Sequence, residues 1–98
     1  MSVYSITSIN VKDWDAYYEY MKLVTPIIKK FGGRYIVRGG KIHSDTTTWQ
    51  PNRVVILEFP TIEQMKEFRE SEEYKPVAAI RQGASTSESF VVEGFDQN

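Results

Sequence analysis

The sequence contains no cysteine, which excludes a disulfide framework and any thiolate chemistry. It has a single histidine, His43, and its carboxylates are scattered, so we expect no metal site. It also lacks a glycine-rich phosphate loop followed by Lys-Ser or Lys-Thr, and it lacks a Gly-x-Ser-x-Gly elbow. The sequence therefore predicts no metal and no cofactor, and it indicates none of the catalytic classes that these motifs mark.

Long apolar runs are also absent. No stretch approaches the roughly 18 unbroken apolar residues of a membrane span, and the first ten residues have no signal-peptide pattern. Twelve lysines and arginines stand against thirteen aspartates and glutamates, for a net charge of −1, and the basic residues are not clustered in the sequence. We therefore expect a soluble cytoplasmic protein that binds neither membrane nor nucleic acid.

At 98 residues with 41% hydrophobic content, the chain is long enough for one domain, which we place at residues 1–98. Alternating β-branched and aromatic residues predict strands, and apolar residues spaced three and four apart predict helices. The expected strands cover residues 2–10, 34–42, 53–59 and 88–95. The first expected helix runs from an Asp13 cap to Gly32-Gly33, with a kink about one turn before Pro26. The second begins at a Thr61 and Gln64 capping box, and after a break a cap at Ser71 precedes a short last helix that starts at Pro76.

This order, βαββαβ, is that of a ferredoxin-like α+β domain, with a four-stranded antiparallel sheet and two main helices on one face. The strand at 53–59 has apolar residues on both faces, with Val55, Leu57 and Phe59 on one side and Val54 and Ile56 on the other. Helices can cover only one of these faces. We therefore expect the second face to pair with a second copy of the chain, as a sheet-to-sheet homodimer.

Two arginines stand between the two Gly-Gly pairs of residues 31–41, FGGRYIVRGGK. An alternation of two predicts that Arg34 and Arg38 share one face, with Arg34 solvated at the strand edge and Arg38 near Glu58 of the next strand. In one interpretation Arg38 holds a carboxylate or enolate in a cavity between the sheets, and Glu58 orients it or moves a proton. In the other, Arg38 and Glu58 form a buried ion pair that only fixes strand register.

The remaining candidates carry weaker signals. His43 is a lone histidine, and such residues are more often inert than catalytic. The polar connection at 43–52 is longer than an ordinary hairpin loop, so it is either mobile or functional, and Trp49 is expected to anchor it. A tyrosine hydroxyl from Tyr17, Tyr18 or Tyr20 would be useful to a ligand at a cavity rim.

Several ordered motifs together resemble a known family. They are Pro26 followed by KKFGGRYIVRGG, then W-x-P-x-R, VVILEFPTIEQ, SEEY, Arg81 and a closing VVEG, and they span nearly the whole chain. They resemble domain of unknown function 1330, in the dimeric α/β-barrel superfamily. The resemblance implies a ferredoxin-like subunit and a sheet-to-sheet dimer, and it places five residues on motif positions: Arg38, Glu58, Tyr74, Arg81 and Glu93. The segment SDTTT departs from the acidic Glu-Gly step of many members, so a ligand gated by this loop would differ.

The family has no settled activity, so the resemblance leaves several functions open. The first hypothesis is a homodimer with a small-molecule pocket between or beside the sheets, taking a small carboxylate or aromatic ligand. Superfamily relatives imply an alternative, a cofactor-independent oxygenase or an isomerase or lyase, for which Arg38 and Glu58 are the catalytic candidates. The third hypothesis is a scaffold or accessory protein whose arginine and glutamate are structural.

Overall fold

The structure, a computed structural model, describes residues 1–43 and 52–95. Its elements follow the order βαββααβ. The strands are β1 (Val3–Val11), β2 (Arg34–Arg38), β3 (Arg53–Phe59) and β4 (Ser85–Glu93), and the helices are α1 (Trp14–Lys30), α2 (Ile62–Glu70) and α3 (Tyr74–Ala84).

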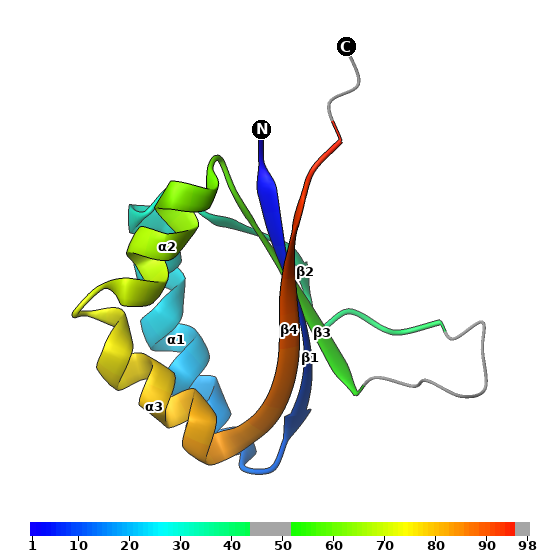
Figure 1. Cartoon of the computed structure of the whole chain (residues 1–98). Coiled ribbons are helices and arrows are strands. Elements are labelled where there is room, and N and C mark those ends of the chain that lie inside the picture. Colours follow the sequence, from blue (N-terminus) through cyan, green and yellow to red (C-terminus); the bar gives the residue numbers. More distant parts are fainter. Residues whose placement is uncertain (44–51, 96–98) are drawn as a thin grey trace.

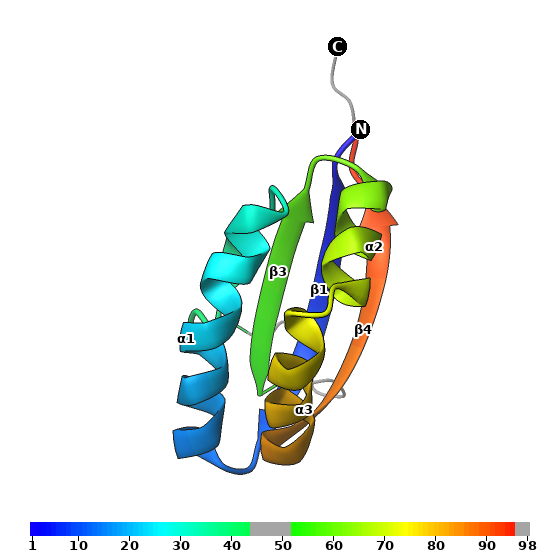
Figure 2. The ribbon, with the colours of Figure 1, turned by 90° about the vertical axis from the view of Figure 1, so that its left-hand side faces the viewer.

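The strands form one antiparallel sheet in the order β2-β3-β1-β4. All three helices lie on the same face of this sheet, and no helix covers the other face in the part of the chain that the structure describes (Figure 1). Seen from the helix side, β3 and β1 lie behind the space between α1 and the pair α2 and α3 (Figure 2). The fold class is therefore the predicted ferredoxin-like α+β arrangement, with the second helical segment divided into two helices.

The ends of α1 have the predicted physical causes. The Asp13 side chain accepts a hydrogen bond from the backbone nitrogen of Ala16 at 3.1 Å, which satisfies one of the free donors of the first turn. The helix continues through Pro26 as one element. It ends where Gly32 adopts a φ of +86°, a conformation that glycine takes at little cost.

Hydroxyl side chains bond to the backbone near the starts of both later helices. The Thr61 hydroxyl accepts from the backbone nitrogen of Gln64 at 3.1 Å and starts α2, as the capping box predicts. The Ser71 hydroxyl accepts from the backbone nitrogen of Tyr74 at 3.2 Å in the turn before α3, whose N-cap position is Glu73 and has no side-chain cap. The helix α3 begins two residues before Pro76 and continues to Ala84, so it is longer than the short helix expected there.

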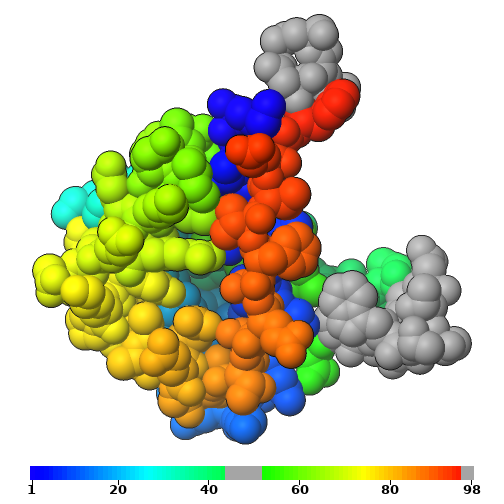
Figure 3. Space-filling view, viewed as in Figure 1, coloured from blue at the N-terminus to red at the C-terminus, as the bar shows by residue number. Residues whose placement is uncertain are grey.

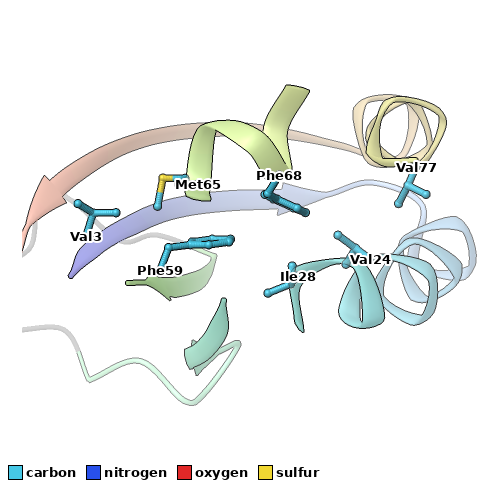
Figure 4. Packing of buried hydrophobic residues seen from close by; sticks show 7 residues of the cluster. All are labelled: Val3, Val24, Ile28, Phe59, Met65, Phe68 and Val77. Atoms are coloured by element: carbon cyan, nitrogen blue, oxygen red, sulfur yellow. The ribbon is translucent and has the colours of Figure 1, made fainter. Parts of the chain in front are cut away.

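The core lies between the helices and the sheet. Phe59 is fully buried at the end of β3, and its ring stacks on that of Phe68 from α2 at a centroid distance of 5.5 Å. Other apolar side chains of the cluster come from α1, α2, α3 and β1 and converge on the same layer (Figure 4). The cluster comprises Val3, Val24, Ile28, Phe59, Met65, Phe68 and Val77.

The face of the sheet without helices, called here the open face, has one apolar row that crosses all four strands. The register pairs Val37 with Ile56, Ile56 with Ile6, and Ile6 with Phe90. Phe90 is 58% exposed, and Val92 on the same face is 45% exposed. The sequence analysis predicted that β3 would have two apolar faces, and the register confirms it.

The structure corrects the limits of two strands. The second strand was expected to reach residue 42, but β2 ends at Arg38, because Gly39 has a φ of +70° and turns the chain away from the sheet. The last strand begins at Ser85 rather than at residue 88, directly after α3. The register between β2 and β3 also shifts between Tyr35 and Val37. This bulge reverses the face of every residue that follows it in β2.

No helix among residues 1–43 and 52–95 is long and apolar enough to cross a membrane. Trp49 and most of the connection at 43–52 lie outside the described residues.

Candidate functional site

A cavity of about 440 Å³ lies between the sheet and the helices, on the side of the sheet opposite the open face. Its floor is formed by two rows of paired residues on the sheet: Arg38, Val55, Thr7 and Ser89 in one, and Tyr35, Leu57 and Ser5 in the other. Helix residues close it from above. Its volume is within the usual range for a ligand site, about 300–1,000 Å³.

One end of the cavity is apolar and is made by the core side chains Ile28, Phe59, Met65 and Phe68. Arg53 and Arg81 lie towards the other end, near the row of Ile9 and Ser87. The sequence has five arginines, and all except Arg34 line the cavity, whereas Lys75 is the single lysine of seven in the described lining. No aspartate, glutamate or histidine is among the described residues that line it. The cavity is therefore strongly cationic in a chain of net charge −1.

Arg53 begins β3 and points to the helix side, since it pairs with the buried Ile9. Its guanidinium carbon lies 5.5 Å from the ring centroid of Tyr17 and 5.9 Å from that of Trp14. The Nη2 atom donates to the Met21 sulfur at 3.3 Å, which is a weak acceptor, and the buried Nε atom has no hydrogen-bond partner. The side chain is thus held in position by aromatic rings while part of its donor set is unused.

Gly39 makes room for this arginine. A Cβ atom at Gly39 would lie 2.0 Å from Nη1 of Arg53, so a side chain there would displace the guanidinium. The glycine that ends β2 thus also allows the guanidinium of Arg53 to lie close against the backbone.

The other arginines reach the cavity from α2, α3 and β2. Arg81 donates from Nη1 to the Ser87 hydroxyl at 2.8 Å, and its Nε atom is buried without a partner. Arg69 donates to the Ser5 hydroxyl at 3.1 Å, and the guanidinium of Arg38 lies 4.8 Å from the Tyr35 ring centroid. In the space-filling view, atoms of α2 and α3 reach towards β4 (Figure 3).

Burial raises the pKa of two tyrosines in the cavity. Tyr17 is almost completely buried, and burial raises the pKa of its phenol, while Arg53 and Arg81 oppose that rise. Burial and the adjacent Tyr74 hydroxyl both raise the pKa of Tyr20. These phenols are therefore hydrogen-bond donors at neutral pH and not bases.

Glu58 lies on the open face, where Tyr4 and Arg34 bind it. The Tyr4 hydroxyl donates to Oε2 and the Arg34 Nε donates to Oε1, both at 2.6 Å. The prediction that Arg38 shares a face with Glu58 was wrong, because the bulge after Tyr35 turns Arg38 to the helix side. The expectation that Arg34 would be merely solvated was also wrong, since Arg34 takes the place in the ion pair that we expected for Arg38.

This arrangement predicts a pH dependence of stability. The Tyr4 hydroxyl and the Arg34 guanidinium hold the pKa of Glu58 below its ordinary value of 4.5. A depressed pKa contributes stability above the unfolded-state pKa and loses it as the pH falls through the folded-state pKa. We therefore expect Glu58→Gln to lower the free energy of unfolding in urea near pH 7, and to lower it less at about pH 3.

A matched control is Glu88→Gln, a carboxylate of β4 that lies on the open face, as Glu58 does, and is exposed in a single chain. It should change the free energy of unfolding little at either pH. If Glu58→Gln lowers the free energy of unfolding by the same amount at both pH values, the assigned role of Glu58 is contradicted.

Of the five residues singled out from the sequence, three line the cavity: Arg38, Tyr74 and Arg81. Glu58 is on the open face, and Glu93 is exposed at the end of β4, so neither lines it. The sequence analysis did not propose Arg53 or Arg69 as site residues. The signal available for Arg53 was its parity with Val55 and Leu57 in β3, which places it on the helix side.

Comparisons with known proteins agree with the fold. The sequence model of a family described as "Domain of unknown function (DUF1330)" matches residues 2–95. No curated protein sequence matches this chain.

Among solved structures, the RPA0582 protein of unknown function from Rhodopseudomonas palustris has a TM-score of 0.81 at 16% identity, covering 98% of this chain and 84% of that one. SnoaB, a cofactor-independent oxygenase from Streptomyces nogalater, has a TM-score of 0.70 at 10% identity, covering 98% of this chain and 95% of its own. Rv0793 from Mycobacterium tuberculosis has a TM-score of 0.59 at 18% identity, covering 99% and 98%. These neighbours are dimeric α/β-barrel proteins, so the similarity assigns this chain to that fold.

Proposed function

We propose that this chain, which belongs to the DUF1330 family, is a homodimer that binds a small molecule in the cavity between its sheet and its helices. The observation that carries the proposal is the cavity itself, with an apolar end, four arginines and several tyrosine hydroxyls. A few polar groups set in an apolar wall are typical of a ligand site.

Binding without general-base catalysis fits the described lining best. An isomerase or lyase would need a group that accepts a proton near neutral pH, and such groups are usually histidine or carboxylate. The described lining contains neither, and the pKa values of Tyr17 and Tyr20 are raised. The arginines could instead stabilise negative charge on a bound molecule.

A cofactor-independent oxygenase is the second candidate, supported by the fold that this chain shares with SnoaB. Such an enzyme would use the arginines and tyrosine hydroxyls to stabilise an anionic form of its own substrate. Arg38 and Arg81 would be the first residues to test in that case, with Tyr74 beside them. Glu58 would take no direct part, because it does not line the cavity.

The open face supports the homodimer. The apolar row from Val37 to Phe90 crosses all four strands, and Ile36, Phe90 and Val92 are each at least 45% exposed in a single chain. Exposed apolar patches of this kind mark protein interfaces. A second copy, packed sheet to sheet about a two-fold axis, would bury the row against its own equivalent. The cytoplasmic location expected from the sequence stays a prediction.

Native mass spectrometry of the purified protein tests both parts of the proposal. We expect two subunits, with extra mass from a small molecule carried through purification. A dimer without extra mass would support the assembly, and small-molecule binding would then be tested by adding probe molecules to the protein. A monomer would contradict the assembly that we propose.

A further inference from the structure

We infer that the ligand is an organic anion with an aromatic or apolar body, and that Arg53 and Arg81 hold its anionic group. This inference rests on the proposed function and specifies the class of molecule that the cavity takes. A carboxylate is the simplest such group, because its two oxygens match the paired donors of a guanidinium.

The first support is the distribution of charge. Arg38, Arg53, Arg69 and Arg81 form no ion pair among the described residues, whose three salt bridges are Lys30–Glu73, Arg34–Glu58 and Lys75–Glu72. Arginine remains charged in proteins, and gathering such charges beside a partly buried cavity is costly unless an opposite charge compensates them. No carboxylate of the described lining compensates these charges, and an anion bound in the cavity would do so.

The second support is the placement of two particular arginines. Arg53 pairs with Ile9 across β3 and β1, and Ile9 pairs with Ser87 across β1 and β4. Ser87 accepts the hydrogen bond from Arg81, so both guanidinium groups lie near one row of the sheet, with β1 between them. Neighbouring strands are about 4.8 Å apart, so the two strands that carry these contacts are about 10 Å apart. Long side chains that approach each other from this separation can hold one anionic group between them.

The third support is the unused donors. The Nε atoms of Arg53 and Arg81 are both buried and have no partner, and they are the only such side-chain atoms in the described part of the chain. Buried donors are nearly always satisfied, so each unsatisfied donor suggests an absent partner. The Tyr17 ring lies against Arg53, and its phenol is within reach of the charge of Arg81, so the two donors belong to one neighbourhood.

The rest of the cavity limits the body of the ligand. The seven residues of β3 from Arg53 to Phe59 span about 20 Å. The far end is formed by Ile28, Phe59, Met65 and Phe68. A molecule with its charge at one end and a flat apolar body would place each part against a matching surface.

Two probes of the same shape test this inference by isothermal titration calorimetry. We expect 2-naphthoate to bind the wild-type protein at least about tenfold more tightly than its neutral analogue 2-naphthamide, because charge-assisted hydrogen bonds are stronger than neutral ones. Equal affinity for the two would overturn the inference and leave the proposed small-molecule site standing. Binding of neither probe would count against both.

The variant Arg81→Gln tests the assigned anchor. It should weaken the binding of 2-naphthoate about tenfold or more and leave that of 2-naphthamide nearly unchanged. Its matched control is Arg34→Gln, the same replacement on the open face, which should keep the wild-type preference. An unchanged preference in Arg81→Gln would overturn the role of Arg81. If Arg81→Gln does not fold by circular dichroism, the wild-type comparison of the two probes decides alone.

Discussion

Phe90→Glu is expected to convert the protein from a dimer to a monomer. Phe90 lies on the edge strand β4, at the end of the apolar row, and is 58% exposed in a single chain. A glutamate there would cost an isolated subunit little, because the side chain remains in water. In a sheet-to-sheet dimer it would place a charge in the apolar contact, where an unpaired charge is very unfavourable. Size-exclusion chromatography with light scattering would measure the change from two subunit masses to one.

The control for this prediction is Leu23→Glu. Leu23 is 40% exposed on α1, so the same charge is added to an apolar residue on the helix layer. This variant should remain a dimer. If both variants stay dimeric, the interface does not lie on the open face.

Phe59→Ala should have the largest effect on stability. Phe59 is fully buried, stacks on Phe68, and packs so closely against Gly33 that a Cβ atom there would lie 2.7 Å from the ring. Removing such a ring loses its transfer free energy and leaves a void, which together cost about 3–5 kcal/mol. Urea denaturation followed by circular dichroism would measure the loss.

Phe95→Ala is the matched control, since Phe95 is 84% exposed. It should change the free energy of unfolding by less than about 0.5 kcal/mol. A loss for Phe59→Ala as small as this would contradict the position assigned to Phe59 at the centre of the core.

Most of the fold follows from local signals in the sequence. The Asp13 cap, the Thr61 cap and the glycines after residue 31 fix where the helices begin and end, and these signals act over a few residues. The two-sided apolar pattern of 53–59 likewise depends only on the alternation of a strand. Such features can be predicted because the interactions that cause them are close in sequence.

The site was harder to predict, because a bulge in β2 decides which face of the sheet Arg38 occupies. A regular alternation puts Arg34 and Arg38 on the same face, and the shift after Tyr35 puts them on opposite faces. No side-chain pattern in the segment indicates this bulge. The four cavity arginines come from β2, β3, α2 and α3, so only the packing of these elements gathers charges that look scattered in the sequence. Tyr74 and Arg81 could be found early through the family resemblance, but not their partners.

The central claim is that the cavity between the sheet and the helices is the ligand site. Ala78→Phe tests it most directly, because Ala78 lines the cavity from α3 and a phenyl ring there would occupy its space, whereas Ala79→Phe adds the same ring at an exposed neighbour. We predict that Ala78→Phe abolishes calorimetric binding of 2-naphthoate while both variants remain folded, and that Ala79→Phe binds as the wild type does. Wild-type affinity in a folded Ala78→Phe would place the site elsewhere and contradict the account.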